Sequence, residues 1–360
     1  MEYLIRMLTS SLILLLIASC DSKGMTTDPN PWKLVKVSGA YCGNGAPVNM
    51  ASFPSPEPTG KLLIYLQSGG ACWDDVTCDY NSAVYTSTGI TDSDVLRDAE
   101  VTATAGVLDR TSQSNPFRND DFAYIPYCTG DVHSGSKTQA GSTGVRHSGG
   151  QNLLVFIEQG ILPKFPDIDE VYLVGASAGG FGSIIMYERI KDLFGAIPVH
   201  LLSDGGMPLP TTPVLTDSSN FRTMAGFQQL LKTNWGYNIY LNLESDFVED
   251  SFGHIAETNT DRRFGLISSL DDTTIQRFIE AGMYGILEFD TFTETDWRNA
   301  MSQIQSLTDT HENSNGFFHQ SQQHVFIRQN TDNFIIGTTS LTDWLEQFRS
   351  GVDWQSYTDL

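Results

Sequence analysis

The sequence predicts an α/β protein in which a mostly parallel central sheet is covered by helices on both faces. The first observation is a series of short apolar runs that have the composition of buried strands, at residues 61–67, 122–128, 171–174, 198–203 and 238–243. The second is that helix-compatible segments separate these runs, as parallel strands require. The third is size, because 360 residues with 40% hydrophobic composition suffice for one large domain with a full core.

The N-terminal segment is typical of an export signal. A single Arg6 precedes the apolar run Ser11–Ile17, which is too short to span a bilayer and is followed by Ala18, Ser19 and Cys20. This ending resembles a bacterial lipobox, in which the cysteine becomes the lipidated first residue of the mature protein. The alternative is an ordinary cleaved signal with an incidental cysteine.

These features divide the chain into three expected parts. They are a lipoprotein signal peptide at 1–19, a tether rich in Ser, Thr, Gly and Pro at 20–31, and a single domain at 32–360. A lipid on Cys20 would hold the domain at a bacterial cell envelope, in the periplasm or on the outer surface. The sequence leaves open which membrane carries the anchor and which oligomeric state the domain adopts.

Four cysteines remain after Cys20, and an even number in an exported chain predicts two disulfides. Three pairings are formally possible. Cys72 and Cys78 are close enough in sequence to close a small loop, which leaves Cys42 with Cys128. A metal site is not expected, because no histidine accompanies these cysteines at zinc-ligand spacing.

A glycine pair follows the first central strand. The run 61–67 leads directly into Ser68-Gly-Gly-Ala-Cys-Trp73. Such a pair can be a tight turn only. Alternatively, its N–H groups point into a cleft and stabilise an oxyanion, and we favour this interpretation because a strand, a glycine loop and a later serine turn occur in the order that esterases use.

The stretch from Val171 to Ser183 predicts a strand, a sharp turn and a helix. Gly175-Ala-Ser177-Ala-Gly179 stands at the join and has the G-x-S-x-G pattern of a nucleophile elbow. Small flanking residues let the backbone adopt the strained turn that exposes the serine hydroxyl at a helix N-terminus, where a developing anion is stabilised. The pattern alone is also compatible with an ordinary turn, but here the expected strand and helix surround it.

The other elements follow in chain order. The strand at 122–128 continues into a polar loop, Thr129–Ser136, at the edge of the sheet where the elbow should lie, and residues 147–161 predict an amphipathic helix. Residues 252–318 look mainly helical and polar; we expect either an insertion that roofs the site or ordinary outer-layer helices. Residues 341–348 predict a closing amphipathic helix.

Several ordered motifs together resemble the pectin acetylesterase and Notum family. They are Gly69-Gly-Ala-Cys-Trp73, Asn115-Pro-Phe117, Pro126-Tyr-Cys-Thr-Gly-Asp-Val-His-Ser-Gly135, His147 with Gly150-Gln-Asn152, Gly175-Ala-Ser-Ala-Gly-Gly180 and Ser203-Asp-Gly205. The resemblance covers most of residues 40–350 and implies an α/β-hydrolase-type fold with a Ser-Asp-His triad. One departure is Ala71, where relatives often carry a tryptophan, so a residue near the oxyanion loop and acyl pocket is smaller here.

In an α/β hydrolase the triad partners follow the serine in the order acid, then histidine. The stretch Ser321-Gln-Gln-His324 resembles the histidine block of the family, and His324 is therefore the expected general base. Asp246 is the expected acid, because it leaves a predicted strand and aligns with the aspartate of the family. The alternatives are Asp250 and Asp204 for the acid, and three further histidines for the base: His254, His311 and His319.

The expected function is that of an exported serine carboxylesterase that removes acetyl groups from carbohydrate through an acyl-enzyme. Ser177 attacks the ester, His324 takes its proton and Asp246 orients His324. The N–H groups of Gly70, Ala71 and Ala178 would hold the oxyanion, and neither a cofactor nor a metal is needed. The alternatives are a Notum-like fatty-acyl deacylase and a catalytically silent binding lipoprotein.

The net charge of −22 restricts the partners. It opposes nucleic acid and anionic membrane surfaces. It also opposes a polyuronate backbone unless a local basic patch exists. The expected partner is therefore an acylated carbohydrate or another ester, with membrane attachment through the lipid on Cys20.

Overall fold

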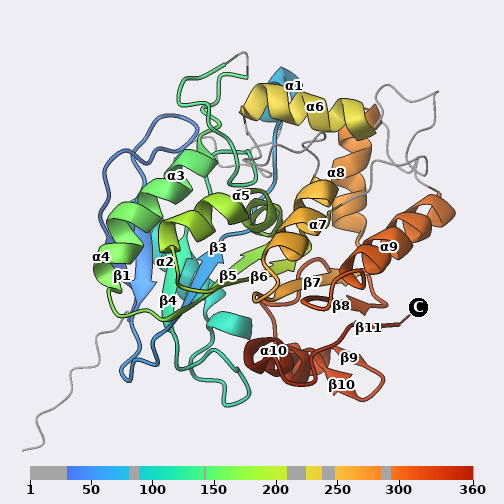
Figure 1. The fold of residues 1–360 in the computed structure, drawn as a ribbon. Helices are drawn as coiled ribbons and strands as arrows, with labels where there is room; N and C mark the ends of the chain where they lie inside the picture. The colour runs from blue at the N-terminus through green and yellow to red at the C-terminus, as the bar shows by residue number, and fades with distance from the viewer. Residues whose placement is uncertain are drawn as a thin grey trace, which may run out of the picture. The chain divides into compact units, whose positions relative to one another are not determined.

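A nine-stranded sheet forms the centre of the structure (Figure 1), in the order β1-β2-β4-β3-β5-β6-β7-β8-β11. The computed structural model describes residues 31–80, 89–141, 143–208, 224–236, 248–284 and 293–359. β2 is antiparallel to β1 and to β4, and every other neighbouring pair is parallel. The strands are β1 (Lys33–Val35), β2 (Met50–Phe53), β3 (Lys61–Leu66), β4 (Asp121–Ile125), β5 (Glu170–Ala176), β6 (Val199–Asp204), β7 (Phe264–Ser269), β8 (Ser314–His319) and β11 (Tyr357–Thr358).

Helices cover both faces of the sheet. On one face Tyr187 of α5 packs on Phe264, and on the other Phe348 of α10 packs on His200. Phe264 and His200 belong to opposite faces, because Phe264 pairs with Leu201, the strand neighbour of His200. The helices are α1 (Asp75–Tyr80), α2 (Asp92–Thr102), α3 (Gly149–Val155), α4 (Leu162–Lys164), α5 (Ala178–Phe194), α6 (Met224–Trp235), α7 (Val248–Thr258), α8 (Thr273–Tyr284), α9 (Glu294–Thr308) and α10 (Leu341–Ser350). No helix in these described ranges is long and apolar enough to cross a membrane.

The topology brings several loops to one edge of the sheet. β3, β5, β6 and β7 are adjacent and parallel, so their carboxyl ends point the same way. The loop after β3, the turn after β5 and the segments after β6 and β7 therefore meet there. In open parallel sheets this is the edge at which ligands bind.

Most of the elements predicted from the sequence are confirmed. The runs at 61–67, 122–128, 171–174 and 198–203 correspond to β3, β4, β5 and β6, and the helix at 341–348 to α10. The helix predicted at 147–161 is α3, which continues as a π-helical segment, Phe156–Ile161. The strand predicted at 238–243 lies outside the described residues.

The prediction that residues 252–318 form a helical insertion or only outer-layer helices was wrong. This segment contains two strands of the central sheet, because β7 pairs with β6 and β8 pairs with β7. Its helices α8 and α9 agree with the mainly helical character predicted for this segment. The segment is therefore an integral part of the fold, and among its described residues only those of α8 line the cavity described below.

Candidate active site

Ser177 occupies a sharp turn between β5 and α5. Its backbone has φ of 54° and ψ of −116°, in the left-handed half of the map that non-glycine residues rarely adopt. Two glycines make the turn possible: a Cβ on Gly175 would lie 2.0 Å from the carbonyl oxygen of Gly179, and a Cβ on Gly179 would lie 2.1 Å from that of Leu66. The Ser177 N–H donates to the carbonyl oxygen of Asp204 at 2.7 Å. The turn thus has the geometry of a nucleophile elbow.

The Ser177 hydroxyl lies against the imidazole of His324. Ser177 Oγ and His324 Nε2 are 2.8 Å apart, and His324 Nδ1 is 2.8 Å from Asp272 Oδ2. With its proton on Nδ1, the neutral ring donates to the aspartate and accepts from the serine hydroxyl. The histidine side chain is 20% exposed, whereas that of Asp272 is 1% exposed. This is the arrangement in which a base activates a nucleophile and a shielded acid orients the base.

Asp272 is positioned by the strand before it and the helix after it. It follows β7 and immediately precedes α8. Its Oδ1 accepts hydrogen bonds from the N–H groups of Thr274 at 3.0 Å and Ile275 at 3.1 Å, so it caps the first turn of α8. Since Oδ1 is fixed by the helix, Oδ2 points toward His324.

The acid that contacts His324 is not the residue predicted from the sequence. We expected Asp246, which lies outside the described residues, and the position next to Nδ1 is occupied by Asp272. Of the two alternatives, Asp204 binds backbone N–H groups of the loop after His324, and Asp250 belongs to α7. The prediction failed because it placed the acid after the run at 238–243, whereas the strand that pairs with β6 is β7. The available signal was the run 264–269 followed by an acidic pair.

The loop after β3 lies beside Ser177. Gly70, Ala71 and Ala178 line the same cavity as the serine. In the described part of the chain, neither Gly70 nor Ala71 donates a backbone hydrogen bond to a backbone acceptor. Ala178 is the first residue of α5, where a backbone N–H has no partner within the helix. The three residues predicted to hold an oxyanion are therefore brought together with the serine.

Covalent and hydrogen bonds hold this loop in place. Both predicted disulfides are present, Cys72 with Cys78 and Cys42 with Cys128. The Cys72 carbonyl also accepts the indole N–H of Trp235 at 2.8 Å, and its N–H donates to the Gly130 carbonyl at 2.9 Å. The disulfides further indicate that the chain folds in an oxidising compartment outside the cytoplasm.

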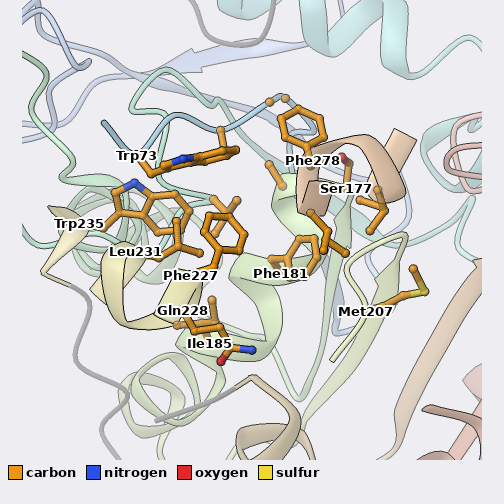
Figure 2. A pocket seen from close by; sticks show the side chains of 17 residues that line it. Trp73, Ser177, Phe181, Ile185, Met207, Phe227, Gln228, Leu231, Trp235 and Phe278 are labelled. Atoms are coloured by element: carbon orange, nitrogen blue, oxygen red, sulfur yellow. The ribbon is translucent and has the colours of Figure 1, made fainter. Parts of the chain in front are cut away.

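An apolar cavity opens at Ser177 (Figure 2). The volume of the cavity is ≈ 110 Å³. Its walls are almost entirely aliphatic and aromatic side chains, from the loops after β3, β4 and β6 and from α5, α6 and α8: Ala71, Trp73, Val132, Ala178, Phe181, Ile185, Met207, Phe227, Leu231, Trp235, Ile275, Phe278 and Ile279. Figure 2 shows Trp73 and Trp235 at the side of the cavity away from Ser177, with Phe227 and Phe181 between them and the serine. The cavity matches an apolar group attached to a reacting carbonyl.

Two buried histidines bind the backbone near the site, but neither lines the cavity that contains Ser177. His133 Nε2 lies 2.8 Å from the carbonyl oxygen of Gln67, and burial lowers the pKa of His133 to about 4. Burial also lowers the pKa of His147, whose Nδ1 lies 2.9 Å from the carbonyl oxygen of Thr129. Both rings are therefore neutral near pH 7 and fix the backbone around the oxyanion loop.

His147 also completes a cluster with metal-ligand chemistry. Its ring nitrogen and the sulfurs of Cys72 and Cys78 lie within 4.8 Å of one another. The two sulfurs are joined in a disulfide, however, and a metal ion is bound by thiolates. The cluster therefore acts as a structural clamp in this state.

The sheet order, the elbow and the hydrogen-bonded Ser177, His324 and Asp272 define a protein of the α/β-hydrolase class. Residues 25–245 match the sequence model of the family described as Pectinacetylesterase. The chain belongs to this family.

Known relatives agree with this assignment. The chain is 28% identical over 162 residues to a palmitoleoyl-protein carboxylesterase NOTUM from Schmidtea mediterranea, which covers 44% of this chain and 30% of that protein. It is 26% identical over 196 residues to human NOTUM of the same description, which covers 52% of this chain and 38% of that protein. The matches thus span about a third of the length of these relatives. The solved structure of the Wnt deacylase Notum from Drosophila superposes with a TM-score of 0.66 at 18% identity, over 91% of this chain and 97% of that one, which confirms the fold.

Proposed function

We propose that the protein is a serine carboxylesterase in which Ser177 is the nucleophile, His324 the general base and Asp272 the acid that orients His324. The observation that carries this proposal is the pair of 2.8 Å contacts that link the three side chains at a nucleophile elbow. Ser177 Oγ attacks the ester carbonyl carbon while His324 Nε2 takes its proton. The intermediate expels the alcohol, which receives that proton, and water then releases the acid from Ser177 in the same way.

The oxyanion of both tetrahedral intermediates is assigned to the N–H groups of Gly70, Ala71 and Ala178. All three residues line the cavity with Ser177. Ala178 adds the positive end of the α5 dipole, which favours negative charge at the helix N-terminus. Preorganised donors of this kind typically contribute a factor of about 100 to 1,000 each in turnover. Neither a cofactor nor a metal takes part in the proposed steps.

The preferred substrate is an ester with an apolar acyl chain longer than acetyl. The support is the composition of the cavity, where aliphatic and aromatic side chains surround the serine. Each methylene group buried there contributes about 0.8 kcal/mol. A butyryl ester, with two more methylene groups than an acetyl ester, should therefore react about ten times faster in kcat/KM. The relatives named as palmitoleoyl-protein carboxylesterases carry such a substrate in their description.

A second candidate is the removal of acetyl groups from carbohydrate. The observation that favours it is the match over residues 25–245 to the Pectinacetylesterase family. An acetyl group would leave most of the apolar cavity unfilled, which is why we rank this function second. Arg328 supports binding of an anionic glycan, because it is exposed and donates to Ser68 Oγ at 2.7 Å beside the oxyanion loop.

The test is hydrolysis of a nitrophenyl ester series from acetyl to palmitoyl by the protein that starts after Cys20, with Ser177→Ala as control. We expect an optimum beyond acetyl and loss of nearly all turnover in the variant. An acetyl optimum would move the assignment to the carbohydrate esterase. Equal hydrolysis by Ser177→Ala would refute the serine mechanism and leave a catalytically silent binding protein.

We further propose attachment to a bacterial cell envelope through a lipid on Cys20, after removal of residues 1–19. This segment lies outside the described residues, and the support is the sequence pattern alone. Residues 20–31 would act as the tether and residues 32–360 as one catalytic domain. Mass spectrometry of the N-terminal peptide should find a diacylglyceryl-modified cysteine, and Cys20→Ala should release the protein from membranes.

A further inference from the structure

Asp204 is a buried carboxylate beside the proposed triad that ester hydrolysis does not require. It ends β6, where it pairs with Ala176 of β5 and Ile267 of β7. Its side chain is fully buried, and its Oδ1 has no hydrogen-bond partner among the described residues. A carboxylate in such a place is destabilising unless its remaining contacts compensate.

Those remaining contacts are to the backbone of the two segments that carry the reacting side chains. The carbonyl oxygen of Asp204 accepts the Ser177 N–H at 2.7 Å. Its Oδ2 accepts the N–H groups of Phe326 at 2.5 Å and Ile327 at 2.8 Å, which directly follow His324 and Val325. One residue therefore fastens the turn that carries the nucleophile and the loop that carries the base.

Both fastened segments are strained. Ser177 has φ of 54° and Val325 has φ of 60°, a conformation that is especially unfavourable for a β-branched residue. Such backbone persists only where the surroundings hold it. The turn after Asp204 packs closely on the same loop, since a Cβ on Gly205 would lie 3.3 Å from His324 Cε1 and 3.2 Å from Val325 Cγ1.

The charge of Asp204 matters for these bonds, because an ionised acceptor forms hydrogen bonds about twice as strong as a neutral one. Burial raises the pKa of Asp204 to about 7, while the two N–H donors and His324 act in the opposite direction and the Asp272 carboxylate raises the pKa further. The titratable groups that influence it are therefore His324 on its loop, Asp272 after β7 and the buried Tyr65 of β3. Asp204 thus changes its charge close to neutral pH.

We propose, on the basis of the esterase activity proposed above, that ionised Asp204 is a positioning residue that sets the distance between Ser177 and His324. In its charged form it holds the loop after His324 against the elbow. In its protonated form that hold weakens, and the imidazole no longer stays within reach of the serine hydroxyl.

The test compares Asp204→Asn with Asp120→Asn. Asparagine keeps the shape and one acceptor oxygen but removes the charge. Asp120 is the matched control, because it is also fully buried but binds Arg349 and Thr59 just before β4, at the opposite edge of the sheet. We expect Asp204→Asn to lower kcat on a nitrophenyl butyrate by about tenfold to a hundredfold with little change in KM. Asp120→Asn should lower the melting temperature without a comparable loss of kcat.

The pH profile separates positioning from a merely structural role. Ionised Asp204 adds a further requirement for activity, so log kcat/KM of the wild type should rise more steeply on the acid side than that of Asp204→Asn. A wild-type profile no steeper than that of Asp204→Asn, or an Asp204→Asn variant as active as Asp120→Asn, would overturn the inference. Absence of wild-type hydrolysis and of fluorophosphonate labelling at Ser177 would instead refute the proposed function.

Discussion

Replacement of Asp272 by asparagine tests the proposed triad most directly. Asp272 makes two kinds of contact: Oδ1 caps α8 through Thr274 and Ile275, and Oδ2 binds His324 Nδ1. An asparagine can keep the cap, because Asn and Asp are similarly effective at this position. It then turns its NH2 group toward a ring nitrogen that donates in the wild type.

The magnitude follows from this mismatch. Facing an amide donor, the imidazole becomes an acceptor at Nδ1, so its proton moves to Nε2 and the ring can no longer accept the Ser177 proton. Loss of the correct tautomer costs about a factor of 10,000 in kcat, or about 5.5 kcal/mol of transition-state stabilisation. Stability should change by less than about 1 kcal/mol, because the cap of α8 is kept.

The assay is kcat for nitrophenyl butyrate together with the melting temperature. Asp246→Asn is the matched control, since it removes the carboxylate that the sequence alone predicted as the acid. We expect wild-type turnover in that variant within about twofold. Turnover of Asp272→Asn within tenfold of wild type, or a loss in Asp246→Asn as large as that expected for Asp272, would refute the assignment.

Three further predictions concern the oxyanion loop, stability and substrate charge. Replacement of Cys72 and Cys78 by serine should lower turnover more than stability, because a six-residue loop contributes little chain entropy whereas its rigidity holds the oxyanion donors; turnover and melting temperature of the double variant check this. Folding raises the pKa of Asp204 from 3.8 to about 7, so its contribution to the free energy of unfolding is complete below pH 3.8 and is lost as the pH rises to 7. Over that range the free energy of unfolding of the wild type should fall by about 1 kcal/mol per pH unit relative to that of Asp204→Asn, as measured by denaturant titration. With a net charge of −22, any acetylesterase activity should favour neutral acetylxylan over acetylated polygalacturonate, and added salt should narrow the gap; faster release of acetate from the polyuronate at low salt would instead indicate that Arg328 outweighs the net charge.

Much of the fold could be predicted because the central strands have a recognisable apolar sequence pattern. β3, β5 and β6 are buried on both faces; β3 and β5 are therefore almost entirely apolar, and β6 is apolar at Val199, Leu201 and Leu202. The elbow was equally accessible, since its glycines are required by close backbone approach rather than by packing preference. Both disulfide pairings could be predicted because Cys72 and Cys78 are close enough in sequence to close a small loop, which leaves Cys42 with Cys128.

β7 was not predicted because tertiary contacts require residues in it that are not typical of a buried strand. Gly265 stands in the strand where a Cβ would lie 2.8 Å from Leu202 Cδ1 and 3.0 Å from Trp344, so a residue of low β-propensity is needed there. Ser269 is buried and polar because its hydroxyl binds the Gln323 carbonyl next to His324. The strand that delivers the acid is thus shaped by the histidine loop and by α10, and neither contact is visible in the sequence.

α8 connects the chemistry of the site to its binding cavity. Its first turn is capped by Asp272, and Ile275, Phe278 and Ile279 on one face of the same helix line the cavity. The carboxylate that orients His324 therefore also fixes the wall against which an acyl chain would pack. A chain that fills the cavity should stabilise α8 in the position that keeps Oδ2 of Asp272 on the imidazole more than an acetyl group does, because it buries more apolar surface against these side chains. Acyl-chain length should consequently affect kcat as well as KM, because contacts with α8 act on the orientation of the base.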